Sequence, residues 1–152
     1  MNKFFQFNEF IEFGKVFSDC EAYLIALDNF DKAITLSYLP INKDHLAEAY
    51  ELRGVTKRFL GRYLESIIDY SKAIELDPKN SYLYFGRGMS YEHLDQNEEA
   101  LKNLKICLML DPDFSLALSM IDFLENEKKW MDKENIKKHL KIIGIYKYSQ
   151  LK

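Results

Sequence analysis

The sequence predicts an all-α fold, in which three helix pairs stack in a row and further helices close the array at the C-terminus. Two observations carry this prediction: a motif repeats along the chain, and apolar residues recur at helical spacing. Composition agrees, because 47% of the 152 residues are hydrophobic and only six are glycine and three proline. Such a balance favours helices over a turn-rich β fold.

The repeat is clearest when residues 47–80 are aligned with residues 81–114. The alignment pairs two Arg-Gly dipeptides and two Leu-Asp-Pro triplets, which are residues 53–54 with 87–88 and 76–78 with 110–112. A third copy lies upstream, at 7–46, where Gly14 corresponds to Gly54. This first unit is longer, and we place its extra residues in a loop around residues 37–44.

Each unit divides into two helical segments with a break between them. Gly61 interrupts the second unit. In the third unit Glu98 follows Asp95 at the spacing of a capping box, and Glu21 follows Ser18 in the same way in the first. We therefore expect side-chain caps at these two breaks.

Small residues recur at matching positions, and we expect them where the paired helices approach most closely. Neither helix of a pair can bury its apolar face alone, so neighbouring units must stack. Prolines end the second helices because proline cannot continue a helix. The expected repeat-packing residues are Gly14, Ala26, Ala33, Gly54, Ala73, Pro78, Gly88, Ala100, Cys107 and Pro112.

These residues resemble the tetratricopeptide repeat family. The match in the second unit consists of Tyr50, Gly54, Tyr63, Ser66, Tyr70, Ala73 and Pro78. The resemblance implies a right-handed α-solenoid with repeats at 7–46, 47–80 and 81–114, a capping helix at 115–128, and a basic C-terminal helix and tail at 132–152. Lys57 departs from the family pattern, which usually has an aromatic residue there. We expect its stem to cover the core while its ammonium stays in water.

Charge is unevenly distributed along the chain. The net charge is −3, but residues 126–152 carry eight lysines and three acidic residues, so the rest of the chain is strongly acidic. An acidic body argues against nucleic acid as a partner. No apolar run is long enough for a membrane helix. With only two cysteines and no evident signal peptide, a cytoplasmic location is expected.

No residue pattern indicates catalysis, a metal or a cofactor, so we expect the chain not to be an enzyme. The histidines at 45, 93 and 139 are far apart and are interpreted as solvated surface. Cys107 falls among the packing residues and is expected in the core. Whether Cys20 is reactive stays open.

The resemblance implies that the first helix of each pair lines a concave face that binds another protein. Helical phase assigns an apolar groove on this face to Leu52, Val55, Tyr82, Phe85 and Met89. Large exposed apolar patches mark interaction sites. Alternatively, some of these residues pack against the terminal helix. A homo-oligomer formed through the groove or the C-terminal helix also stays open.

One role of the family is not expected here. Modules that bind the acidic tails of heat-shock chaperones use Lys, Asn and Arg side chains at five positions, which correspond to Ile11, Lys15, Leu52, Tyr82 and Gly86. The leading hypothesis is instead an adaptor that binds an apolar or aromatic segment. The alternatives are a bacterial three-repeat secretion chaperone and a regulatory or neutralising subunit of an enzyme.

Overall fold

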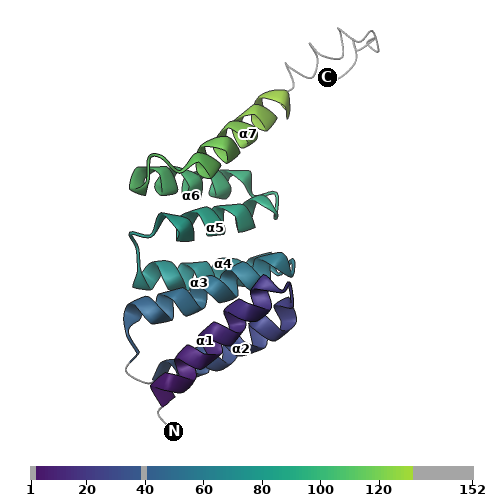
Figure 1. The fold of residues 1–152 in the computed structure, drawn as a ribbon. Coiled ribbons are helices and arrows are strands. Elements are labelled where there is room, and N and C mark those ends of the chain that lie inside the picture. The colour runs from purple at the N-terminus through teal and green to yellow at the C-terminus, as the bar shows by residue number, and fades with distance from the viewer. Residues whose placement is uncertain (1–2, 39–40, 132–152) are drawn as a thin grey trace, which may run out of the picture.

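The computed structural model describes residues 3–38 and 41–131, and within them it contains α-helices and no strand (Figure 1). The elements are α1 (Lys3–Asp19), α2 (Tyr23–Thr35), the 3-10 turn η1 (Leu36–Tyr38), α3 (Lys43–Phe59), α4 (Tyr63–Leu76), α5 (Ser81–Glu92), α6 (Asn97–Leu110) and α7 (Ser115–Met131). The predicted all-α array of helix pairs is confirmed. The helix and tail expected at 132–152 lie outside the described residues.

The helices form three pairs, α1 with α2, α3 with α4 and α5 with α6, and α7 follows on α6. Neighbouring pairs meet mainly through α2 on α3 and α4 on α5. By contrast, α1 touches α3, and α3 touches α5, at few points. The three first helices therefore share one face of the array without closing it. None of the described helices has the length and apolar character needed to cross a membrane.

The turns inside the three pairs share one backbone conformation. Glu21, Gly61 and Asp95 occupy the same register and all have positive φ, at 57°, 72° and 57°. The helices that follow begin after Ala22, Arg62 and Gln96, without a side-chain cap. The two expected capping boxes are therefore wrong. Glu21 and Asp95 form the tight turn itself, which glycine adopts most readily, rather than the N-cap.

Small residues do line the contacts within the pairs. Of the expected repeat-packing residues, the glycines, alanines and Cys107 are buried, whereas Pro78 and Pro112 are exposed just beyond α4 and α6. The tightest approach within a pair is at Gly14, against the ring of Phe30, and the tightest between pairs is at Gly86, against the ring of Tyr70. At both positions an added Cβ would overlap the ring. The expected list did not include Gly86.

Two arginines at the same register connect each helix pair to the one before it. Arg53 on α3 donates to Asp69 on α4 and to Asp31 on α2, with N···O distances of 2.6–2.9 Å. Arg87 on α5 donates to Asn103 on α6 (2.8 Å) and to Ser71 on α4 (3.0 Å). We call these two sets of hydrogen bonds the arginine bridges. Each bridge fixes a first helix to the second helices on both sides of it.

The ammonium of Lys57 is not in water, which corrects the sequence-based expectation. Lys57 is 9% exposed, and its Nζ lies 2.9 Å from Asp69, which is itself 1% exposed. The repeat explains the pair, because Lys57 replaces Phe17 and Tyr91 where Asp69 replaces Asn29 and Asn103. An aromatic residue and an amide have thus been exchanged together for two opposite charges.

The glycine contacts predict opposite effects for two alanine substitutions. Gly54→Ala should stabilise the fold by up to about 1 kcal/mol, since its Cβ would meet only ordinary contacts, at 3.4 Å or more, and alanine favours helix. Gly86→Ala should destabilise it by about 1–3 kcal/mol, because the buried ring of Tyr70 must move. Urea midpoints measure both, and a Gly86→Ala variant at least as stable as the parent would contradict the packing.

The exchange at Lys57 and Asp69 predicts strong coupling between them. Lys57→Tyr and Asp69→Asn each leave one buried charge with fewer partners, so each should destabilise the protein. The double variant restores the arrangement of the third unit and should be more stable than the sum of the single effects implies, by about 1–3 kcal/mol. Urea unfolding of the four proteins gives this coupling energy. Additive effects would mean that the two side chains act independently.

Candidate functional site

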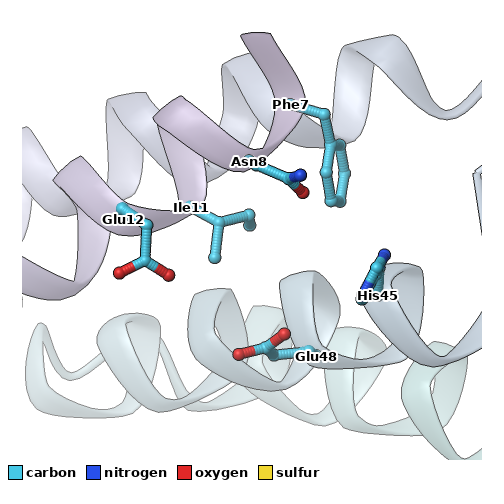
Figure 2. Close-up of a pocket in the computed structure, with 6 residues that line it drawn as sticks. All are labelled: Phe7, Asn8, Ile11, Glu12, His45 and Glu48. Carbon is cyan, nitrogen blue, oxygen red and sulfur yellow. The ribbon is translucent and has the colours of Figure 1, made fainter. Parts of the chain in front are cut away.

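An open hollow of about 290 Å³ lies between α1 and α3 on the face shared by the first helices. Figure 2 shows Asn8, Ile11 and Glu12 reaching down from α1 and Glu48 reaching up from α3. The residues that line it are Phe7, Asn8, Ile11, Glu12, His45 and Glu48. The hollow therefore combines apolar side chains, carboxylates, an amide and an imidazole.

Helical spacing brings these side chains together. Asn8, Ile11 and Glu12 stand at i, i+3 and i+4 on α1, and His45 and Glu48 stand at i and i+3 on α3, so each set shares one side of its helix. Phe7 and Ile11 are almost fully buried and anchor α1 in the first apolar cluster. The opposed helices thus present polar groups beside apolar side chains that belong to the core.

Lys15 joins the two carboxylates of the hollow. Its Nζ lies 2.7 Å from Oε1 of Glu48 and 3.0 Å from Oε1 of Glu12. The hydrogen bond with Glu48 is the main cause that raises the pKa of Lys15. One lysine against two carboxylates leaves a net negative charge.

Glu51, one turn further along α3, adds to this negative field. Burial raises the pKa of Glu51, and the nearby charges of Glu48 and Asp77 raise it further. The carboxylate is thus less favourably ionised in the folded protein than in water.

His45 carries the least satisfied polar atom of the hollow. Its Nδ1 is buried and has no hydrogen-bond partner among the described residues. The ring of Phe4 lies 6.0 Å from the imidazole. The interpretation of His45 as solvated surface is therefore wrong. His93 is exposed, as expected, and its ring stacks on that of Tyr63 with 4.6 Å between the ring centroids. His139 lies outside the described residues.

The five residues assigned to the apolar groove are distributed over three clusters. Leu52 packs on the first cluster, with Phe7, and Val55 packs on the middle one, with Tyr70. Phe85 packs on the third, which includes residues of α7. Met89 is half-buried.

Tyr82 is the most accessible of the five, at 63% exposure, and its ring meets Phe114 edge-on at 4.8 Å. Phe85 contacts the same ring at 5.0 Å, so the structure brings these two aromatics together. Tyr82 stands at the register of Glu48 and Asn8 in the earlier units. It therefore continues the line of the hollow along the face. Whether the five residues bind a partner stays a prediction.

The cysteines occupy contrasting environments. Cys107 is fully buried, and burial raises the pKa of its thiol to about 11. A thiol with this pKa is almost entirely protonated near neutral pH, so Cys107 is a core residue in this fold. Cys20 is exposed. Within residues 3–38 and 41–131, no group of three or more His, Cys, Asp or Glu side chains is arranged to hold a metal.

Comparison with protein families decides the assignment. Two models described as tetratricopeptide repeat match residues 47–80 and 70–102. The chain is a tetratricopeptide repeat protein. It is 33% identical over 95 residues to sperm-associated antigen 1 from Mus musculus, an alignment that covers 62% of this chain and 10% of that protein. This chain thus spans about a tenth of that relative.

Solved structures share the fold. The Hsp90 co-chaperone Cns1 from Saccharomyces cerevisiae superposes with a TM-score of 0.80 at 19% identity, covering 91% of this chain and 44% of that one. The first TPR of Spaghetti (RPAP3) bound to the HSP90 peptide SRMEEVD gives a TM-score of 0.74 at 18% identity, covering 82% and 94%.

The five positions that would bind an acidic chaperone tail offer little positive charge. Lys15 is their only cation, and it is paired with two glutamates. Ile11 is buried, and Gly86 lies against Tyr70. The sequence analysis interpreted His45 as solvated surface and therefore missed it as a residue of the hollow. The i, i+3 spacing of His45 and Glu48 was the available signal.

Glu51 gives a pH-dependent prediction. A carboxyl whose pKa is raised by folding destabilises the folded state when it is ionised, and this cost disappears as pH falls below the ordinary value of 4.5. Glu51→Gln should therefore raise the urea midpoint at pH 7, and the gain should vanish at a pH below 4.5. The exposed Glu75, which pairs with Lys72, offers the control Glu75→Gln. A lower urea midpoint of Glu51→Gln at pH 7 would contradict the conclusion that burial and neighbouring carboxylates disfavour the ionised Glu51.

Proposed function

We propose that this chain is a non-enzymatic adaptor that binds a peptide or helix of another protein along the face formed by α1, α3 and α5. The open hollow between α1 and α3 is the observation that carries the proposal. The exposed ring of Tyr82 continues the same register on α5. A face with a recess at one end and an accessible aromatic residue further along suits an extended or helical segment, because aromatic residues contribute strongly to interfaces.

The comparisons support a protein partner, whereas the charge of the recess argues against an acidic chaperone tail. The Spaghetti repeat domain is bound to an HSP90 peptide that ends in Glu-Glu-Val-Asp. Here the recess is lined by Glu12 and Glu48, which repel such a peptide. We therefore propose a partner segment without an acidic terminus. A cytoplasmic location is part of the same proposal.

Two other functions of the same class are distinguished by what co-purifies. A secretion chaperone should bring down several secreted substrates, whereas a regulatory or neutralising subunit should bring down one stoichiometric enzyme. Self-association through the groove would appear as a dimer that competes with the partner.

The test is affinity purification of the chain with mass spectrometry, followed by binding measurements with the partner identified. Tyr82→Ala should weaken binding about tenfold or more, since burying an aromatic side chain contributes about 1.5–3 kcal/mol. Phe85→Ala is less informative, because Phe85 also supports the cluster around Phe114.

Lys102→Ala is the matched control, because Lys102 is exposed on α6 and pairs only locally with Glu99. Circular dichroism should first establish that both variants remain folded. Equal affinity of Tyr82→Ala and Lys102→Ala would exclude this face as the binding surface. The peptide SRMEEVD serves as a negative probe, and saturable binding of it would contradict the proposed partner class.

A further inference from the structure

We propose that the hollow between α1 and α3 receives an arginine side chain from the partner segment. This inference rests on the proposed function and names the chemistry of the ligand. It follows from the size of the hollow, its negative charge and the unpartnered nitrogen of His45.

The hollow has the size and the base that one long side chain needs. Its volume of about 290 Å³ corresponds to roughly ten water molecules, given about 30 Å³ for each. Phe7 and Ile11 provide apolar contact for an aliphatic stem. In Figure 2 they project from α1 toward α3, where His45 and Glu48 face them. A long side chain with an apolar stem and a polar head matches this distribution.

The charge of the hollow selects a cation. Glu12 and Glu48 both bond to Lys15 through one oxygen, Oε1, which leaves the second oxygen of each outside these ion pairs. Glu51 stands one turn from Glu48 on α3 and adds a further carboxylate nearby; burial raises its pKa most, and the charge of Glu48 raises it further. A second cation therefore gains more here than it would beside a neutralised ion pair.

The spread of the acceptors favours arginine over lysine. The buried Nδ1 of His45 lacks a hydrogen-bond partner among the described residues, and Asn8 and Glu48 line the same space. These groups come from two helices, so no single N–H can satisfy them together. A guanidinium presents five N–H donors in a rigid fork, whereas an ammonium is a compact point charge.

The experiment is an NMR titration of the full chain with N-acetyl-arginine-N′-methylamide. We expect saturable shifts confined to the residues of the hollow, above all the side-chain amide of Asn8 and the ring of His45. The citrulline analogue has nearly the same shape without the charge and should bind at least tenfold more weakly. The lysine analogue should fall between the two.

Glu48→Gln should weaken the arginine probe about tenfold, whereas Glu99→Gln should leave it unchanged. Glu99 is a suitable control because it also pairs with a lysine, Lys102, but on α6. Asn8→Ala provides a second variant in the hollow should Glu48→Gln fail to fold. Absent or diffuse shifts, equal affinity for citrulline, or an unchanged affinity in Glu48→Gln would each overturn the inference.

The result can be separated from the fate of the proposed function. A partner that binds Glu48→Gln normally but loses affinity for Tyr82→Ala would leave the face intact as a binding surface and remove only the arginine site. If the partner binds both Glu48→Gln and Tyr82→Ala with unchanged affinity, the face formed by α1, α3 and α5 is not the binding surface.

Discussion

The arginine bridges are the constraint on which the spacing of this array depends. Arg53 and Arg87 each tie a first helix to its own second helix and to the second helix of the preceding pair. Apolar contact alone would allow neighbouring pairs to slide, since the hydrophobic effect has no direction. Hydrogen bonds from a planar guanidinium do have direction, and they set how far each pair is displaced from the last. Arg53 donates to two carboxylates, whereas Arg87 donates to an amide oxygen and a hydroxyl.

Because the contacts between pairs run mainly through α2 on α3 and α4 on α5, one side of each first helix can carry residues that bind a partner. The second helices carry most of the contact between pairs, so α1 and α3 need not fill the space between them. Polar side chains can then face one another across that space without being forced into a core. The hollow is thus a result of where the packing is concentrated, and its chemistry is set by the few residues that project into it.

The sequence predicted the repeat, the helix pairs and the face, because each depends on spacing along one helix. It did not predict contacts that depend on distant residues. The alignment of the repeats paired Arg53 with Arg87. Their partners Asp69 and Asn103 differ in charge, so the sequence did not indicate that both arginines make the same hydrogen bond. Gly86 was absent from the expected packing residues, because only the fold brings the ring of Tyr70 against it. His45 joins Asn8 only when α3 lies beside α1.

Among the described helices, the last one, α7, is attached differently from the rest. Ile121 on α7 stands at the register of Arg53 and Arg87, so no guanidinium of this kind fastens α7 to α6. Apolar contacts, with Ala117 and Leu124, and the exposed pair of Lys105 with Glu125 hold it instead. In a repeat array, an end held in this way opens at a lower free-energy cost than the middle. Opening there would uncover Phe114 and the side of Phe85 beneath it, which makes this aromatic edge of the face adjustable.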